Sequence, residues 1–233
     1  MKLSARLQSL FNMVTPGYVI CDIGCDHGFL SIALIEQGVC PFAYAMDLRK
    51  DPLARAREHI EEAGLSDKIE LRLSDGAEEL KKDEADSVVI AGMGGNVMMH
   101  ILENGKEVLS SVKELILQPQ SELKGFREYL FKEGYRLIAE DMVEEDGKYY
   151  PMMKVSPPGE INGENAWAKK PEEKDFLYGP LLLKERHPVL YEYLQRELGI
   201  KNEILSGLPE KRHQRAEEVK ESIHLIESIL EVW

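Results

Sequence analysis

A strand pattern over residues 18–22, ending in the carboxylate of Asp22, leads into a short loop that holds Gly24 and Gly28. The loop leads into an apolar helical pattern over about 28–37. A strand, a tight loop and a helix in this order are typical of an open α/β sheet, in which ligands bind at the carboxyl ends of the strands. This stretch therefore predicts a ligand site around the loop.

The chain continues to alternate between strand and helix patterns as far as residue 155. Apolar and alternating runs predict strands, and apolar residues at spacings of three and four predict helices. The predicted strands are 40–47, 69–73, 87–91 and 114–120; the predicted helices are 3–14, 51–63, 96–103 and 121–133; and a final hairpin pairs 135–142 with 148–155. This alternation predicts an α/β fold with a parallel sheet and helices on both faces.

The pattern changes after the hairpin. Residues 156–175 are rich in Pro, Gly, Asn and charged residues, which predicts a linker or a long loop. Beyond them, apolar residues recur at helical and heptad-like spacings on both sides of a turn at 207–209, which predicts two antiparallel helices packed on each other. We therefore expect two units, residues 1–160 and residues 161–233.

Composition excludes several classes of protein. No apolar run approaches the length of a membrane helix, and the N-terminal residues lack the apolar core of a secretory signal, which favours the cytoplasm. The three cysteines have no partners at metal-ligand spacing, so we expect reduced thiols and no metal. A net charge of −13 argues weakly against nucleic acid as a partner. We expect a monomer.

The glycine loop differs from a dinucleotide-binding loop at one position. Asp26 stands where the middle glycine of that fingerprint belongs, and its carboxylate would repel a pyrophosphate, which disfavours NAD and FAD. S-adenosyl-L-methionine instead carries a sulfonium cation and an ammonium group. Asp22 or Asp26 can offset these charges, and Gly24 permits close approach to the backbone.

Two further strand ends carry carboxylates that suit the rest of this cofactor. Asp47 follows the second strand, and its acceptor-only carboxylate matches the two donor hydroxyls of a ribose. Asp75 ends the third strand, where it can accept from the exocyclic amine of adenine while Gly76 leaves room for the ring. A single aspartate at a strand end is more often a turn or a cap, so the prediction depends on the set.

Five segments together resemble the bacterial TrmK-like tRNA methyltransferase family: residues 22–28, 45–47, 74–76, 90–95 and 117–120. The resemblance covers nearly the whole chain. It implies a Rossmann-like class I methyltransferase sheet with a C-terminal antiparallel, coiled-coil-like helical hairpin. It also implies transfer of a methyl group from S-adenosyl-L-methionine to N1 of the adenine at nucleotide 22 of tRNA.

The chain departs from the family pattern at two places. Gly28 and Phe29 stand where an Ala-Tyr pair is frequent, and Gln120 stands where Asn is usual. Phe29 cannot donate a hydroxyl hydrogen bond, so a polar role at that position is in doubt, whereas stacking remains available.

The candidate site residues combine the strand ends with the family motifs. The predicted cofactor-binding residues are Asp22, Gly24, Asp26, Asp47, Leu48, Asp75, Gly76, Ala91, Gly92 and Met93. The predicted catalytic residues are Asp26, His27, Gln118 and Pro119. The predicted substrate-binding residues are Arg6, Phe29, Gly94, Gly95, Asn96, Tyr149 and Tyr150.

Each proposed role has a simpler structural alternative. Asp26, helped by His27, would stabilise the cationic product base or accept its proton, but His27 also suits a purely structural position. Arg6 is either a substrate contact or a solvated side chain. Tyr149 and Tyr150 either stack on an unstacked base or only pack the hairpin.

Basic residues in the C-terminal helices suggest a grip on the tRNA backbone, with a solvated helix face as the alternative because acidic residues are interleaved. These residues are Arg186, Arg196, Lys201, Lys211, Arg212 and Arg215. Three other functions stay open: a methyltransferase for a small molecule or protein, a cofactor-binding module without catalysis, and, third, a nicotinamide oxidoreductase.

Overall fold

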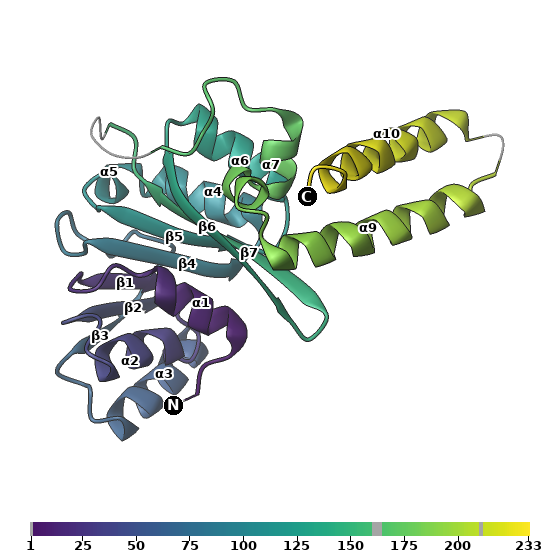
Figure 1. Ribbon diagram of the computed structural model, residues 1–233. Coiled ribbons are helices and arrows are strands. Elements are labelled where there is room, and N and C mark those ends of the chain that lie inside the picture. Colours follow the sequence, from purple (N-terminus) through teal and green to yellow (C-terminus); the bar gives the residue numbers. More distant parts are fainter. Residues whose placement is uncertain (1, 160–164, 210–211) are drawn as a thin grey trace.

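The computed structural model describes residues 2–159, 165–209 and 212–233. Its strands form one sheet (Figure 1). They are β1 (Ile20–Ile23), β2 (Ala43–Asp47), β3 (Ile69–Leu73), β4 (Ser87–Met93), β5 (Glu114–Pro119), β6 (Arg136–Glu145) and β7 (Lys148–Ser156). The predicted strands are all present, and the predicted hairpin is formed by β6 and β7.

The strand order is β3-β2-β1-β4-β5-β7-β6. β1 pairs in parallel with both β2 and β4, and β4 pairs in parallel with β5, whereas β7 runs antiparallel to both β5 and β6. The predicted Rossmann-like class I methyltransferase sheet is confirmed. The chain order reverses between β1 and β4, and a ligand crevice forms at such a switch point, beyond the carboxyl ends of the strands.

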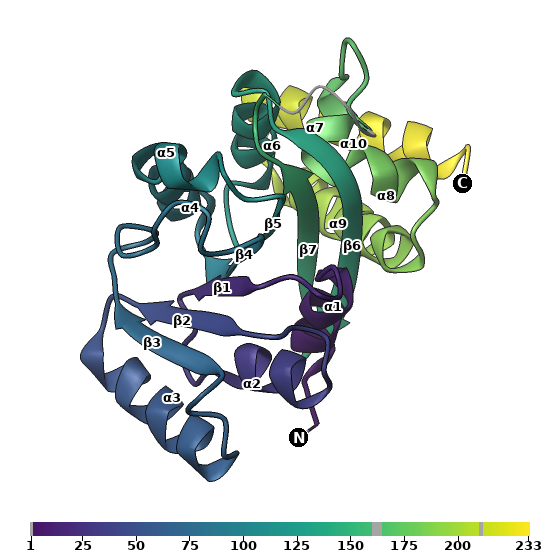
Figure 2. The same ribbon diagram turned by 90° about the vertical axis from the view of Figure 1, so that its left-hand side faces the viewer.

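Helices cover both faces of the sheet (Figures 1 and 2). They are α1 (Ala5–Met13), α2 (Phe29–Glu36), α3 (Lys50–Glu62), α4 (Gly95–Asn104), α5 (Lys106–Leu109) and α6 (Leu123–Lys132). One apolar cluster contains buried residues of α1, α2 and α3, and another contains those of α4, α5 and α6. Because side chains alternate along a strand, β4 serves both clusters: Val88 and Ile90 face one, and Val89 faces the other.

The C-terminal region contains α7 (Glu173–Tyr178), α8 (Pro180–Lys184), α9 (Pro188–Gly207) and α10 (His213–Leu230). α9 and α10 lie side by side and extend away from the sheet (Figure 1). Their buried residues Leu190, Leu194, Ile226 and Ile229 form a cluster that also includes Met142 of β6. The predicted helices are therefore present, and their inner end packs against the sheet.

Of the predicted alternatives for 156–175, a linker or a long loop, the buried Trp167 favours a packed loop, and the predicted C-terminal bound is wrong. Trp167 is buried in the main core, and its Nε1–H donates to the carbonyl of Tyr135 at 3.1 Å. α7 begins within the predicted linker, at Glu173. The predicted boundary between residues 160 and 161 lies outside the described residues.

A buried ion pair joins α7 and α8 to the sheet. Arg127 of α6 donates from Nε to Oε1 of Glu140 at 3.0 Å and from Nη1 to the carbonyls of Phe176 and Leu177, each at 3.2 Å. The other oxygen of Glu140 accepts from the backbone N–H of Leu181 at 3.0 Å. Both charged side chains are almost fully buried, so the charge of each depends on the other for its compensation.

Among the residues that the structure describes, no helix is both long enough and apolar enough to cross a membrane.

Candidate active site

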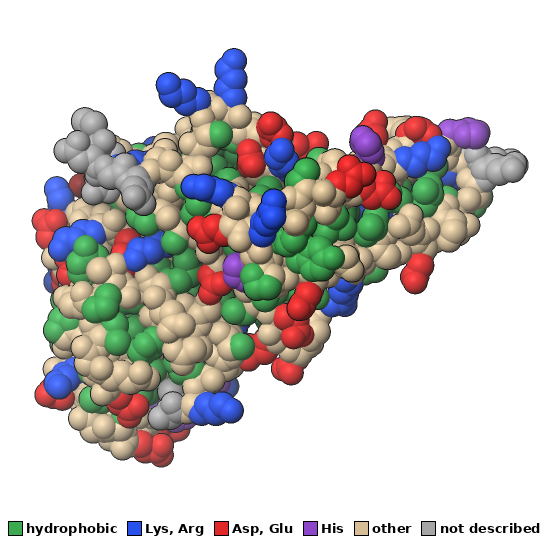
Figure 3. Space-filling view, viewed as in Figure 1, with side chains coloured by type: hydrophobic (Ala, Val, Ile, Leu, Met, Phe, Trp, Pro, Cys, Tyr) green, Lys and Arg blue, Asp and Glu red, His purple; other side chains and the backbone are tan. Residues whose placement is uncertain are grey.

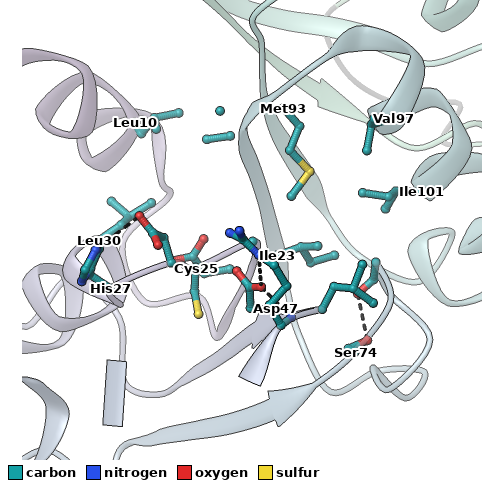
Figure 4. A pocket seen from close by; sticks show the side chains of 18 of the residues that line it. Leu10, Ile23, Cys25, His27, Leu30, Asp47, Ser74, Met93, Val97 and Ile101 are labelled. Carbon is teal, nitrogen blue, oxygen red and sulfur yellow. Dashed lines mark hydrogen bonds and ion pairs between the residues drawn. The ribbon is translucent and has the colours of Figure 1, made fainter. Parts of the chain in front are cut away.

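A cavity of about 550 Å³ opens beyond the carboxyl ends of β1, β2, β3 and β4, at the switch point of the sheet. In Figure 4, Met93, Val97 and Ile101 lie along one side of the cavity, Asp47 and Ser74 lie along another, and His27 lies at one end. Every residue predicted to bind the cofactor lines this cavity, and so do Arg6, His27 and Phe29. The parallel sheet brings these residues together because its strand ends meet at one edge.

The loop after β1 is shaped by its backbone. The N–H groups of Gly24 and Cys25 both donate to the carbonyl of Met46, at 2.8 and 2.9 Å, which fastens the loop to the end of β2. Gly24 has φ +78°, and a Cβ added there would lie 2.2 Å from Cε of Met93. Asp26 has φ +49°, a left-handed conformation that aspartate tolerates better than most residues, and its side chain is 61% exposed. The positive φ therefore favours glycine at 24, whereas Asp26 presents its carboxylate to solvent.

Asp22 is the most deeply buried carboxylate of the cavity wall, and it accepts a hydrogen bond from Oγ of Ser31 at 3.1 Å. Burial raises the pKa of Asp22 to about 6, and the nearby charge of Asp47 adds to the rise, while the Ser31 hydrogen bond and Arg6 oppose it. A buried carboxylate of this kind gains stability when a cation binds beside it.

Asp47 is held by the turn that follows β2. Its Oδ1 accepts from the backbone N–H of Arg49 at 2.8 Å, and the exposed Arg49 guanidinium lies 3.8 Å away. The Asp47 side chain is only 8% exposed, yet it lines the cavity. A carboxylate fixed in this way can accept further hydrogen bonds from a ligand without reorganising.

Beyond Asp47 the cavity wall becomes a slot with apolar sides. Leu48 and Val97 line it and are 62% and 53% exposed, so both present apolar surface to a ligand in the cavity. A Cβ on Gly76 would lie 3.0 Å from the side chain of Ile101, so the glycine allows the loop after β3 to approach α4. The exposed carboxylate of Asp75 stands at the edge of this slot.

His27 belongs to a cluster of three rings, in which the centroids of His27 and His59 lie 5.6 Å apart. Its ring is parallel to that of Phe29, with centroids 5.3 Å apart, and Phe29 in turn stacks on His59 at 4.8 Å. Nδ1 of His59 lies 3.0 Å from the carbonyl of His27. Nε2 of His27 lies 3.7 Å from the Asp26 carboxylate, and its Nδ1 is buried without a hydrogen-bond partner among the described residues. The histidine is thus held in place and faces Asp26.

Gln118 and Pro119 do not line the cavity. Gln118 is fully buried, and its Oε1 accepts from Nη1 of Arg6 at 3.2 Å and from the N–H of Gly92 at 3.1 Å. Gln118 therefore contributes to the site indirectly: it holds Arg6 and Gly92, and these two residues line the cavity. Arg6 is accordingly anchored at the cavity rather than only solvated.

The segment that begins α4 also lies outside the cavity wall. A Cβ on Gly95 would lie 2.7 Å from the carbonyl of Ser121, and one on Gly94 would lie 3.0 Å from the Ser121 hydroxyl. Close packing against Ser121 thus accounts for both glycines, and Asn96 is exposed.

Tyr149 and Tyr150 line a second cavity of about 510 Å³, and Gln120 lines both cavities. The guanidinium of Arg6 lies 5.8 Å from the centroid of the Tyr150 ring. The structure therefore places the two tyrosines beside the first cavity rather than in it.

Sequence reasoning missed several residues of the first cavity, among them Arg49, Ser74, Val97, His100 and Ile101. Val97, His100 and Ile101 could have been grouped from the sequence, because His100 and Ile101 follow Val97 by three and four residues on the predicted helix 96–103 and so share its face. Arg49 and Ser74 flank predicted aspartates, but nothing in their local pattern marks them.

The first cavity is acidic: four aspartates line it, against two arginines, Arg6 and Arg49. This donor set fits S-adenosyl-L-methionine, whose cationic end suits Asp22 and Asp26 and whose ribose and adenine suit Asp47 and the apolar slot. It fits a pyrophosphate poorly. Within the described part of the chain, no group of His, Cys, Asp and Glu is arranged to hold a metal ion.

Comparisons with known proteins agree with this chemistry. The model of the family described as tRNA (adenine(22)-N(1))-methyltransferase matches residues 20–228. The tRNA (adenine(22)-N(1))-methyltransferase of Bacillus subtilis (strain 168) is 34% identical over 236 residues, covering 99% of this chain and 98% of that protein.

Solved structures give the same result across the whole chain. Sp1610 of Streptococcus pneumoniae, in complex with S-adenosyl-L-methionine, is similar with a TM-score of 0.86 and 30% identity, covering 98% of this chain and 100% of that chain. TrmK of M. capricolum, in complex with S-adenosyl-homocysteine, is similar with a TM-score of 0.83 and 26% identity, covering 100% of this chain and 99% of that chain. The chain therefore belongs to the TrmK family of tRNA (adenine(22)-N(1))-methyltransferases.

Proposed function

We propose that this protein transfers a methyl group from S-adenosyl-L-methionine to N1 of the adenine at nucleotide 22 of tRNA, acting in the cytoplasm as a monomer. The observation that carries the proposal is the acidic cavity at the switch point of the sheet, with Asp26 and His27 at its wall, in a member of this family. A nicotinamide cofactor is disfavoured because its pyrophosphate would meet Asp22 and Asp26.

The cofactor supplies an electrophilic methyl group on a positively charged sulfur. Asp22 offsets the cationic end from within the wall, and the Gly24 backbone allows close approach. Asp47 accepts from the ribose hydroxyls, since its carboxylate is already oriented by the N–H of Arg49. The apolar slot between Leu48 and Val97 takes the adenine ring of the cofactor.

The substrate adenine must leave its stack before N1 can react. Phe29 supplies an aromatic ring at the cavity for the unstacked base, and the rings of His27 and His59 pack against it and fix its position. Asp26 stabilises the positive charge of the product base or accepts the proton that its N6 amine loses. Much of the remaining rate enhancement comes from positioning the base.

We also propose that residues 1–160 bind the cofactor and that residues 161–233 contact the tRNA. The face seen in Figure 3 mixes acidic with basic side chains, in keeping with the net charge of −13. Lys201 lies 3.6 Å from Glu197, and Arg215 lies 3.0 Å from Glu218. Arg186 and Arg212 are exposed, and Lys211 lies outside the described residues. These ion pairs reduce the positive charge that the helices present to the phosphates of tRNA.

The test is to incubate unmodified tRNA with the protein and isotopically labelled S-adenosyl-L-methionine and to analyse the nucleosides by mass spectrometry. We expect labelled 1-methyladenosine. Label found only in a small molecule or in protein would favour a methyltransferase of another substrate class. Tight cofactor binding without any transfer would favour a binding module.

A further inference from the structure

The second cavity, of about 510 Å³, lies between the tip of the β6–β7 hairpin and helices α6, α7 and α9. Its volume is in the range of small-ligand sites, about 300–1,000 Å³. Four tyrosines contribute to its wall: Tyr149, Tyr150, Tyr178 and Tyr193. The residues come from both sides of the predicted linker, so the cavity exists only because α7 and α9 pack against the hairpin.

The aromatic wall is held in a defined arrangement. The rings of Tyr149 and Tyr193 meet edge to face, with centroids 5.2 Å apart. The guanidinium of Arg196 lies 5.7 Å from the Tyr149 ring centroid, and its Nη1 donates to the carbonyl of Gly147 at 2.7 Å. Among the described residues, Lys148 and Arg196 stand at this wall against one carboxylate, that of Glu197, so this lining lacks the acidic character of the first cavity.

Arg127 supplies a polar group that the fold does not use. Its Nε and Nη1 are hydrogen-bonded to Glu140 and to the backbone of α7, whereas its Nη2 is buried without a partner among the described residues. An unpaired buried donor is costly unless a ligand or a water satisfies it. A carbonyl oxygen or a ring nitrogen of a nucleobase would satisfy it.

The two cavities adjoin each other. Gln120 lines both, and Arg6 of the first cavity faces Tyr150 of the second. Bases of single-stranded or unstacked RNA bind by stacking on aromatic side chains, with hydrogen bonds to their edges. We propose that the second cavity binds another unpaired nucleobase of the RNA substrate, one that flanks the target adenine along the strand. This inference rests on the proposed function.

The protein arm of the test replaces Tyr149 by alanine in the full chain. We expect KM for tRNA to rise about tenfold, in keeping with the loss of one base–aromatic stack, while kcat and the affinity for S-adenosyl-homocysteine stay within about twofold. Tyr149→Phe keeps the ring and should restore most of the tRNA affinity. The matched control is Tyr18→Ala, which removes a half-buried tyrosine that lies outside residues 161–233 and lines neither cavity.

The RNA arm uses two tRNAs, each with a single abasic nucleotide: one next to the target adenine on its 5′ side and one next to it on its 3′ side. One of these abasic tRNAs should bind the wild-type protein about tenfold more weakly than the intact tRNA does. The same abasic tRNA should bind Tyr149→Ala no more weakly than the intact tRNA binds that variant. Such non-additivity shows that the missing base and Tyr149 act on each other.

Two results would overturn the inference. One is full additivity at every flanking position. The other is a Tyr149→Ala variant that loses kcat rather than tRNA affinity, which would mean that the target adenine itself occupies the cavity. The coupling is read from dissociation constants as well as from rates. A protein that binds tRNA with this coupling but methylates nothing would refute the proposed function and leave the subsite standing.

Discussion

Replacing Asp47 by asparagine tests the cofactor site with little change of shape. The carboxylate is 8% exposed, and its Oδ1 accepts from the N–H of Arg49 at 2.8 Å. The amide oxygen of asparagine can keep that bond, so the free energy of unfolding should change by less than about 1 kcal/mol. The loss therefore falls on the ligand rather than on the fold.

The size of the loss follows from what the carboxylate offers. Two ribose hydroxyls would each donate to an ionised oxygen, and such bonds contribute about 1.5–3 kcal/mol each. Asparagine keeps one acceptor, without its charge, and turns a donor toward the second hydroxyl. We expect about 3 kcal/mol of lost binding free energy, which corresponds to roughly a hundredfold weaker binding.

The assay is calorimetric titration with S-adenosyl-homocysteine, which binds without turnover. Asp51→Asn is the matched control, because it removes the same charge from an exposed position on α3 outside the cavity, and it should bind like the wild type. If Asp47→Asn binds within about twofold of the wild type while remaining folded, the assignment of Asp47 to the ribose is refuted.

Burial raises the pKa of Asp22 to about 6, whereas an aspartate in the unfolded chain titrates near about 4. As pH rises from about 4 to 6, the free energy of unfolding should therefore fall by up to about 3 kcal/mol relative to that of Asp22→Asn, as measured by urea denaturation. A bound cation favours ionised Asp22, so calorimetry should show S-adenosyl-L-methionine affinity rising with pH up to about 6 and levelling off above. Asp26→Asn should lower kcat by about a hundredfold or more in a methyl-transfer assay, whereas Asp83→Asn, another exposed aspartate with positive φ, should not. Arg127→Leu strands the buried Glu140 carboxylate and should cost about 3–5 kcal/mol in urea denaturation, and a loss below about 1 kcal/mol would contradict the ion pair's role.

The central sheet was predictable because its strands are short, apolar and separated by clear helical patterns. The apolar run 87–91, for example, suits a central parallel strand covered on both faces, and β4 has that position. α7 and α8 were not predicted because helices of six and five residues show no full apolar period. Trp167 is buried by contacts with residues far away in sequence, which local composition cannot reveal.

The cofactor wall was predictable for a related reason. Asp22 and Asp47 end neighbouring parallel strands, so position along the chain implies position in space. The outer part of the site depends on contacts between distant segments: Gly95 packs on Ser121, and the hairpin residue Tyr149 meets Tyr193 of α9. Such contacts have no period or motif in the sequence.

If the chain methylates N1 of the adenine at nucleotide 22 of tRNA, transfer requires that nitrogen. The most direct measurement compares two tRNAs that differ only at that nucleotide, one with adenosine and one with 1-deazaadenosine, which lacks the N1 nitrogen. Transfer from labelled S-adenosyl-L-methionine is counted, and the site is mapped by arrest of reverse transcription. We predict transfer and arrest at nucleotide 22 with adenosine, and neither with the deaza analogue. Equal methylation of both tRNAs would contradict the account.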